Sequence, residues 1–368
     1  MKKALLLSGI YWDETWQRHQ QFAEYLVSMG YKVYFVEHIV SSVLTVKKVK
    51  EMLIGAETVN LSSNNPRSEN IVLCSIKSLP PQKRLFYIWN KNQVKKLIKE
   101  IGNQFDVVFN YLPINTTRYF LERIEYKTLI YDCVRNFTGW TGCQYPKDIG
   151  NEEEVLSNCA DMVFTDSFYL TDKFRSMGCK DKVVQFFPVI DRKWQQGVAN
   201  KPVSKQIVKV AYFGTFSTIH NDVEVYKALA DAGFEIHFWG SVPLNLEFSY
   251  VDHGFKNNLA ELSREITEKC DAIVIAYRGN MDGVIPAKLF QAIGSNLPVF
   301  ISRFYDAEKL SEYMYVFSDK NDLIDQMRKF SPEDYSLKKE KNVKFLEDKG
   351  GETQYEQFKS VISQKQQN

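Results

Sequence analysis

Hydrophobic and polar positions along the chain form an alternating series of short apolar runs and longer amphipathic stretches. The apolar runs Ala4 to Ser8 and Lys32 to Val36 enclose a stretch from Thr15 to Met29 in which apolar residues recur at helical spacing. Short apolar runs are typical of buried parallel strands, and three- and four-residue spacing is typical of an amphipathic helix. The pattern therefore predicts a strand, helix, strand opening with a right-handed crossover, as in a Rossmann-like domain.

The same alternation continues along the chain and restarts after one break. Strands are expected over residues 71–74, 106–110, 128–131, 161–165, 183–187, 208–213, 235–239, 272–276, 297–301 and 313–317. Helices are expected over residues 83–101, 116–124, 152–159, 167–177, 224–232, 258–269 and 286–294, and two or three more follow the last strand, the final one over residues 353–362. From Pro188 to Gln206 the pattern gives way to Pro, Gly, Lys, Asn and Gln, a composition typical of a linker. We therefore expect an α/β protein with Rossmann-like domains over residues 1–190 and 207–349.

The loop after the first expected strand lacks the glycine-rich dinucleotide fingerprint, because Gly9 is its only glycine. Trp12, Asp13, Arg18 and His19 stand in or just after this loop. Loops at the carboxyl ends of parallel strands are where such sheets bind ligands, so we assign these four residues to acceptor or sugar contact. A single histidine is more often solvated or bonded internally, and that alternative stays open for His19.

A second polar group follows the strand expected over residues 128–131, between Tyr131 and Phe137. Asp132 is the candidate general base in this group. A carboxylate can accept the proton of an attacking hydroxyl group when it lies within hydrogen-bond reach of that group. A role for Asp132 in a turn or a helix cap is the alternative.

The segment from Asp282 to Ser302 has the pattern of a phosphate site. Pro286 suits the first position of a helix and Gly294 suits a left-handed stop, so a short helix is expected between them. Lys288 and Gln291 lie side by side on this helix, near the end where the dipole and the free N–H groups favour an anion. A lysine and a glutamine suit a diphosphate next to a ribose. The alternative is an ordinary amphipathic helix with two solvated polar side chains.

Other strand ends of the second half carry residues suited to a nucleotide. The candidates are Gly214, Thr215, Phe216, Gly240, Tyr277 and Arg278. Gly214 lets the backbone approach a ligand closely. Tyr277 can stack on a nucleotide or bond to it, and Arg278 can pair with a phosphate or a uronic carboxylate. Exposed strand-end side chains without a ligand are the alternative for both.

The residues from Pro286 to Val299 read Pro-x-Lys-Leu-x-Gln-x-x-Gly-x-x-x-Pro-Val. This sequence resembles the nucleotide-sugar signature of the GT-B glycosyltransferases, with Gln291 where most of those enzymes have a glutamate that grips the donor ribose. The Lys-x-x-Gln form with an upstream tyrosine, here Tyr277, is similar to that of the xanthan-type glucuronosyltransferases and of teichuronic-acid-type glycosyltransferases. The segment from Ala160 to Ser167 resembles the step that closes the first half of GT-B enzymes.

The resemblance implies a GT-B fold, in which two Rossmann-like domains face each other across a cleft and the final helix, residues 350–368, packs back onto the first domain. It implies that the second domain binds a nucleotide-sugar donor, with UDP as the expected nucleotide. It also implies that a carboxylate of the first domain, here Asp132, activates the acceptor. The likeness to the xanthan-type enzymes favours inversion and a uronic donor.

Composition narrows the expected partners. The formal net charge of +2, without a polybasic tail, gives no support to a nucleic-acid partner. The six cysteines have no metal-binding spacing and no Asp-x-Asp occurs, so we expect activity without a metal or another cofactor. The scattered cysteines are typical of free thiols in a reducing cytoplasm, so we expect a cytoplasmic protein. No stretch approaches the roughly 20 apolar residues of a membrane span.

The helix expected over residues 83–101 has a basic and aromatic surface. Its cations are Lys83, Arg84, Lys91, Lys95, Lys96 and Lys99. The stretch from Val46 to Lys50 adds three more lysines to the first half. Such a helix can lie on anionic lipid, so a lipid-linked acceptor would favour peripheral contact with the cytoplasmic face of a membrane. A core-packed helix with a solvated lysine face is the alternative.

Together these features predict a glycosyltransferase that moves a sugar from a nucleoside-diphosphate sugar to a glycan or lipid-linked acceptor in bacterial surface polysaccharide synthesis. A nucleotide-sugar 2-epimerase or a phosphorylase on the same scaffold is one alternative. A non-enzymatic, two-lobed sugar-binding protein is another, although it would need an export signal and several crossovers between its lobes.

Overall fold

The computed structural model describes residues 1–14, 16–43, 65–81, 84–139, 144–188, 192–218, 220–242 and 246–367. The expected basic stretch from Val46 to Lys50 lies outside these ranges. The chain forms two compact units. Unit 1 comprises Met1–Phe186 and Tyr355–Asn368, and unit 2 comprises Phe187–Gln354. No helix in the described ranges is both long and apolar enough to cross a lipid bilayer.

Unit 1 is built on a parallel sheet, which in the described residues has seven strands in the order β3-β2-β1-β4-β5-β6-β7. The strands are β1 (Lys2–Leu7), β2 (Tyr31–Glu37), β3 (Ile71–Ser75), β4 (Gln104–Asn110), β5 (Glu125–Cys133), β6 (Met162–Thr165) and β7 (Val183–Gln185). The strands are strongly apolar, since the sheet is buried on both faces.

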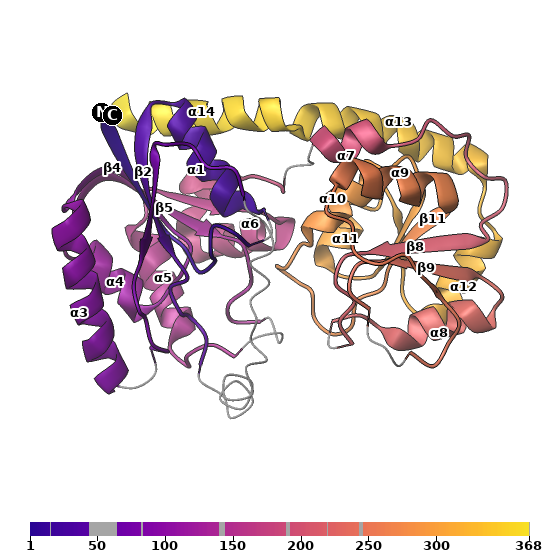
Figure 1. Cartoon of the computed structure of the whole chain (residues 1–368), viewed down its shortest axis with the longest axis horizontal. Coiled ribbons are helices and arrows are strands. Elements are labelled where there is room, and N and C mark those ends of the chain that lie inside the picture. The colour runs from indigo at the N-terminus through magenta and orange to yellow at the C-terminus, as the bar shows by residue number, and fades with distance from the viewer. Residues whose placement is uncertain are drawn as a thin grey trace. The chain divides into compact units, whose positions relative to one another are not determined.

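Helices cover both faces of this sheet. They are α1 (Arg18–Ser28), α3 (Arg84–Ile101), α4 (Asn115–Leu121), α5 (Ile149–Cys159), α6 (Phe168–Phe174), a π-helical turn (Arg175–Cys179), a 3-10 turn (Lys180–Lys182) and the end of α14 (Gly351–Gln367). Phe22 of α1 packs against Phe109 of β4 and against Phe358 of α14, so α1 and α14 share one face. α3 and α4 pack together and lie on the other side of the strands (Figure 1).

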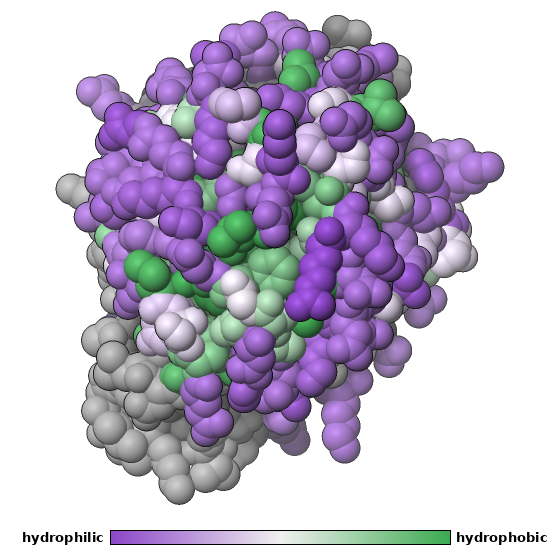
Figure 2. Space-filling view, turned by 90° about the vertical axis from the view of Figure 1, so that its right-hand side faces the viewer, coloured by the Kyte–Doolittle hydropathy of each residue, from purple (hydrophilic) through white to green (hydrophobic). Residues whose placement is uncertain are grey.

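Unit 2 is built on a second parallel sheet, which in the described residues has six strands in the order β10-β9-β8-β11-β12-β13. The strands are β8 (Lys209–Phe213), β9 (Glu235–Trp239), β10 (Val251–Asp252), β11 (Ala272–Ile275), β12 (Val299–Ser302) and β13 (Tyr315–Phe317). The helices are α7 (Arg192–Gly197), α8 (Val223–Asp231), α9 (Leu259–Lys269), α10 (Ala287–Ile293), α11 (Tyr305–Lys309), α12 (Lys320–Arg328) and α13 (Pro332–Lys349). The side of the molecule seen in Figure 2 is mostly hydrophilic, with a central band of hydrophobic residues.

Helix starts follow from local capping chemistry. Side chains that accept hydrogen bonds from the first free N–H groups are Ser167 at α6, Asp222 at α8, Asn258 at α9, Asp319 at α12 and Ser331 at α13. Each is a short polar residue of the kind that best satisfies an N-terminal turn.

The segment from Pro188 to Gln206, expected as a linker, contains a helix that belongs to unit 2. This helix, α7, buries Trp194, whose ring stacks on that of Phe213 with 4.8 Å between centroids. The carbonyl of Trp194 also accepts a 2.7 Å hydrogen bond from Ser263 of α9. Trp194 is the only buried residue of α7 and its neighbours are Arg, Lys and Gln, so the sequence has no helical periodicity of apolar residues here. The hydrophobic pattern therefore did not predict this helix.

The ends of α10 differ from the sequence expectation. Pro286 is not the first helical residue but the extended residue before it, with φ −76° and ψ 129°. Gly294 does not take the left-handed conformation, since its φ is −79°, and Asn296 takes it instead with φ 59°. Asparagine tolerates that region better than most residues, so Asn296 can make the turn into β12.

Both sheets reverse their strand order next to the first strand of the unit. In unit 1 the reversal lies between β1 and β4, and in unit 2 it lies between β8 and β11. Parallel α/β sheets bind ligands outside the carboxyl ends of the strands at such a switch point. The side chains at these two switch points are therefore the best placed to bind a ligand.

Candidate functional site

Lys288 of α10 occupies the switch point of unit 2. Its Nζ donates hydrogen bonds to the Tyr212 hydroxyl at 2.7 Å and to the Phe213 carbonyl at 3.0 Å, and it lies 4.2 Å from the centroid of the Tyr212 ring. Tyr212 and Phe213 end β8. The lysine that the sequence placed at a helix start therefore lies at the carboxyl end of the central strand.

The ammonium group of Lys288 lacks a counter-charge. No carboxylate of the described residues forms an ion pair with it, and burial lowers its pKa from 10.5 to about 7. The side chain still keeps partial exposure to solvent. A cation in this condition is stabilised by an incoming anion, which would restore its charge and raise its pKa.

Two glycines bring their loops close to this lysine. Gly214 has φ +99°, and a Cβ built on it would lie 3.0 Å from Lys288 Nζ. Gly240 has φ +131°, and a Cβ built on it would lie 2.3 Å from the Gly214 carbonyl oxygen. The backbone conformation favours glycine at both positions, and at Gly240 the space beside the Gly214 backbone also requires it. The loops after β8 and β9 are thus packed against each other beside the ammonium group.

The remaining donor-site candidates lie around the same strand ends with different exposure. Tyr277 follows β11 and is half-buried; burial, and then Tyr212, raise the pKa of its hydroxyl well above 10. Arg278 is exposed, and its backbone N–H donates to the His220 carbonyl. Gln291 is half-buried, and its side chain forms no hydrogen bond with the described residues.

The neighbouring residues Thr215 and Phe216, in the loop after β8, differ in burial. Phe216 is 2% exposed and packs its ring against those of Tyr212, Tyr226 and Phe238, so its side chain belongs to the core and not to a binding surface. This differs from its expected role as a nucleotide contact, because the Phe216 side chain is buried in an aromatic cluster and leaves no ring face for a ligand. Thr215 is exposed.

In unit 1 the expected site residues are largely internal. Trp12 is 1% exposed and packs edge-on against Phe35, which removes it from acceptor contact. Asp13 is half-buried and accepts a 3.1 Å hydrogen bond from the backbone of Asn65. Asn65 also donates to the carbonyls of Trp12 and Glu14, so this loop is fixed by the segment that follows residue 64.

Arg18 and Asp132 form a buried ion pair with each other. Arg18 Nε donates to one carboxylate oxygen at 2.9 Å, and its Nη2 lies 2.6 Å from the other. The Asp132 side chain has no solvent exposure and that of Arg18 is 9% exposed. Burial raises the pKa of Asp132, while Arg18 opposes that rise. This carboxylate is paired and closed to solvent, so an acceptor hydroxyl can reach it only if the pair with Arg18 opens.

His19 is also satisfied internally. Its Nδ1 is hydrogen-bonded to the Ser8 hydroxyl at 2.8 Å, and its ring stacks on that of Tyr111 with 3.7 Å between centroids. Burial, followed by the charges of Arg135 and Arg18, lowers its pKa to about 3. His19 is therefore a neutral residue that fills the switch point between β1 and β4, as the internally bonded alternative predicts.

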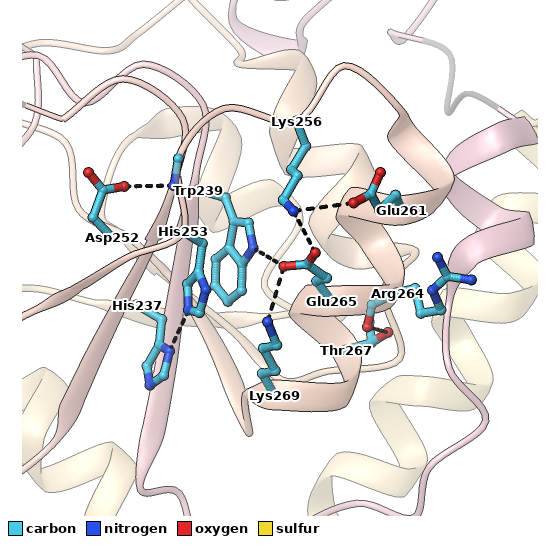
Figure 3. Close-up of polar contacts among 11 residues, drawn as sticks. His237, Trp239, Asp252, His253, Lys256, Glu261, Arg264, Glu265, Thr267 and Lys269 are labelled. Carbon is cyan, nitrogen blue, oxygen red and sulfur yellow. Dashed lines mark hydrogen bonds and ion pairs between the residues drawn. The ribbon is translucent and has the colours of Figure 1, made fainter.

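Sequence reasoning missed a polar cluster behind Gly240. Trp239 stacks on His253, and His237 is hydrogen-bonded to His253 at 2.9 Å (Figure 3). Glu265 of α9 accepts from Trp239 Nε1 and is ion-paired with Lys256 and Lys269.

These contacts connect α9 to the loop that carries Gly254. The hydrogen bond from Lys256 is the main cause that lowers the pKa of Glu265 to about 2, so the carboxylate stays charged. The Gly254 carbonyl accepts from Gly240 N, so the cluster supports the glycine pair. Its only sequence signal is the alternation of His237 and Trp239 along β9, which places both on one face. No three His, Cys, Asp or Glu side chains gather as metal ligands in the described part of the chain.

Comparisons with known proteins place this geometry in a fold class. No protein-family model and no curated protein matches the sequence. The structure is similar to sucrose-phosphate synthase from Thermosynechococcus elongatus, with a TM-score of 0.71, 12% identity and 99% of both chains covered. It is similar to an E. coli trehalose-6-phosphate protein bound with UDP-2-fluoro glucose, with a TM-score of 0.66, 10% identity and 99% of both chains covered.

A third similar structure is the lipopolysaccharide outer core galactosyltransferase WaaB, with a TM-score of 0.63, 12% identity, and 99% of this chain and 100% of that chain covered. These proteins are GT-B glycosyltransferases. The chain therefore has the GT-B fold, as the resemblance in residues 286–299 implied.

Proposed function

We propose that the protein is a glycosyltransferase that uses a nucleoside-diphosphate sugar, with UDP as the nucleotide. The observation that carries the proposal is the position of Lys288. Its ammonium group lies at the switch point of unit 2, bonded to neutral oxygens of Tyr212 and Phe213 and without a carboxylate partner in the described residues. One of the similar structures supports the nucleotide, because it is bound with UDP-2-fluoro glucose.

The chemistry follows from charge. When the bond from the sugar to the diphosphate breaks, negative charge grows on the departing phosphate oxygens. Lys288 is placed to stabilise that charge, and a preorganised cation in a partly dry site does so without reorganisation. The Gly214 backbone approaches the phosphates, Gln291 takes the ribose, and Tyr277 and Arg278 take the base or the sugar. Gly240 holds the Gly214 loop in position.

The acceptor binds unit 1 in this proposal, and the transfer needs no metal ion or other cofactor. The stereochemical outcome depends on the base. Inversion requires a base that reaches the acceptor hydroxyl, and Asp132 can serve only if its pair with Arg18 opens. The anomeric configuration of the product, read by NMR, decides whether such a base exists.

The acceptor is a glycan or a lipid-linked saccharide of bacterial surface polysaccharide synthesis, and the enzyme acts at the cytoplasmic face of the membrane. The xanthan-type likeness of Lys288, Gln291 and Tyr277 supports this assignment. So does the similarity of the fold to a lipopolysaccharide galactosyltransferase.

Turnover of a panel of nucleotide sugars tests the proposal. We expect release of UDP from one or a few UDP-sugars, stimulated by acceptor, together with thermal stabilisation by UDP. Conversion of one nucleotide sugar into its 2-epimer without release of UDP would favour the epimerase alternative. Stabilisation by free sugars and not by UDP would favour a sugar-binding protein.

A further inference from the structure

α3 differs in charge from α13, the other helix of the same length. Each of these two helices has 18 residues and five basic side chains. The acids of α13 are Glu333, Asp334, Glu340, Glu347 and Asp348, which balance its charge. α3 has one acid, Glu100, and therefore a net charge of +4. A solvated helix in a protein with a formal charge of +2 does not need such an excess.

The inner face of α3 is fully used by unit 1. Val94, Leu97 and Ile101 are buried in the core. Asn90 is also buried; it accepts from the Leu79 N–H and donates to the Leu79 carbonyl, both at 2.8 Å. The orientation of the helix about its own axis is thus fixed, and its other face is directed to solvent.

The outer face of α3 is divided along its length. Its first two turns expose apolar side chains, with Leu85 78% exposed, Ile88 48% and Trp89 45%. The following turns expose Lys95, Lys96 and Lys99. These positions recur at three- and four-residue spacing, so they form one stripe that is apolar at the start of the helix and basic further on.

Trp89 is fixed in position although much of its side chain is exposed to solvent. Its Nε1 donates a 2.7 Å hydrogen bond to the Lys77 carbonyl, which fixes the ring while leaving nearly half of its surface exposed. Ile88 is the residue before Trp89, and Leu85 lies one turn earlier on the same stripe. Three large apolar side chains exposed together on one helix are unusual on a soluble surface and mark a binding surface.

A pocket lies beside the same turns. It has a volume of about 870 Å³, and its lining includes the cations Arg84 and Lys147, the rings of Tyr87 and Tyr145, and one acid, Asp148. Tyr145 is positioned by a 3.1 Å hydrogen bond from Arg135. Aromatic rings and cations suit a saccharide that carries a negative charge. The first turns of α3 thus contribute to this pocket on one side and to the apolar stripe on the other.

We propose that the outer stripe of α3 binds the surface of an anionic lipid bilayer. Leu85, Ile88 and Trp89 enter the boundary between headgroups and acyl chains, and Lys95, Lys96 and Lys99 pair with anionic headgroups. The contact holds the adjoining pocket at the level of the headgroups, where the saccharide end of a lipid-linked acceptor is presented; this last step rests on the proposed function. The lysines favour an anionic lipid surface over a neutral protein partner, because their charge is complementary to the headgroups. The exposed apolar side chains favour a lipid surface over a nucleic acid.

The test is binding of the full chain to vesicles of phosphatidylcholine alone and of phosphatidylcholine with phosphatidylglycerol, read by co-sedimentation. The native chain is expected to bind the anionic vesicles only. Lys95→Gln with Lys96→Gln and Lys99→Gln should weaken this binding by roughly a hundredfold. Leu85→Ser with Ile88→Ser should weaken it by roughly tenfold or more.

Matched controls come from α13. Lys339→Gln with Lys344→Gln and Lys349→Gln, and Leu337→Ser with Val343→Ser, remove the same kinds of side chain from a neutral helix and should leave vesicle binding unchanged. Far-UV circular dichroism and the dissociation constant for UDP should be unchanged in all four variants.

Equal binding by the α3 variants and the native chain overturns the inference, as does an equal loss in the α13 controls. Binding to a single-stranded oligonucleotide in place of anionic vesicles also overturns it. Failure of the proposed function is distinguishable, because it appears as absence of UDP binding in the native chain while vesicle binding persists.

Discussion

In unit 1 the ionisable side chains at the ends of the central strands are bonded to one another, whereas in unit 2 a lysine at the corresponding place has no counter-charge among the described residues. His19 fills the unit 1 switch point against Ser8 and Tyr111. Lys288 reaches the unit 2 switch point and contacts neutral oxygens. The same strand arrangement thus places internally bonded polar side chains at the switch point of unit 1. At the switch point of unit 2 it places a cation that can bind an anion.

Charged residues have different roles in the two units. A charged pair such as Arg18 and Asp132, buried together, maintains the fold, and removing one member leaves the other charge uncompensated. A partly exposed cation such as Lys288 contributes little to folding through ion pairing and is available to a ligand. Stability measurements should therefore respond to changes in unit 1, and ligand binding should respond to changes in unit 2.

The largest expected effect is on the buried pair of unit 1. Asp132→Ala should lower the free energy of unfolding by about 3–5 kcal/mol, because it leaves the Arg18 guanidinium buried without its counter-charge. Urea denaturation measures this. Asp231→Ala breaks the exposed pair with Lys227 and should cost no more than about 0.5 kcal/mol. A combined Arg18→Met and Asp132→Leu variant should recover most of the loss. If Asp132→Ala keeps its stability and loses only turnover, Asp132 is the base after all.

The next effect concerns the glycine pair of unit 2. Gly240→Ala should lower the free energy of unfolding by about 2 kcal/mol or more and weaken UDP binding, since its Cβ would meet the Gly214 carbonyl at 2.3 Å. Gly233→Ala is the matched control, with φ +93° and no atom within 4 Å of its Cβ. It should cost about 1 kcal/mol through backbone strain alone and leave UDP binding intact. Equal effects of the two substitutions on UDP binding would remove the loops from the site.

A smaller effect is the pH dependence of UDP binding. Burial places the pKa of Lys288 at about 7, so the ammonium form is complete below that pH and declines above it. Since UDP binds the charged form, its bound state has the higher pKa, and affinity should fall by up to about tenfold per pH unit above pH 7. Calorimetry across this range should show the slope in the native chain and a flatter profile in Lys288→Met. A slope that persists in the variant would assign the titration to another group.

Much of the fold was readable from the sequence, because both sheets consist of short apolar strands separated by amphipathic helices. The elements that escaped prediction are α7, the two-residue β10 and α11. Each is too short for a periodic pattern to develop, and α7 is defined by the burial of Trp194, which is a tertiary contact. The turn at Asn296 escaped because Gly294 offered the stronger local signal for a left-handed residue.

The sequence predicted the candidate sites only where the residue type and its neighbours along the chain are sufficient. The sequence singled out Lys288 and Gly214 separately, but the bond from Lys288 to the Phe213 carbonyl joins residues 75 positions apart. Arg18 and Asp132 had the residue types of a ligand site, yet they satisfy each other across 114 positions. Long-range pairing determines whether a charge faces a ligand or the interior, and a single sequence does not contain that information in local form.

If Lys288 receives the diphosphate of the donor, its removal should weaken the binding of UDP, which calorimetric titration measures. The control is Lys309→Ala, which removes another lysine that lies over a tyrosine ring in unit 2, 5.4 Å from the centroid of Tyr305. Lys288→Ala should raise the dissociation constant for UDP by tenfold or more, about 1.4 kcal/mol, while Lys309→Ala should leave it unchanged. An unchanged affinity in Lys288→Ala would show that Lys288 does not bind the diphosphate.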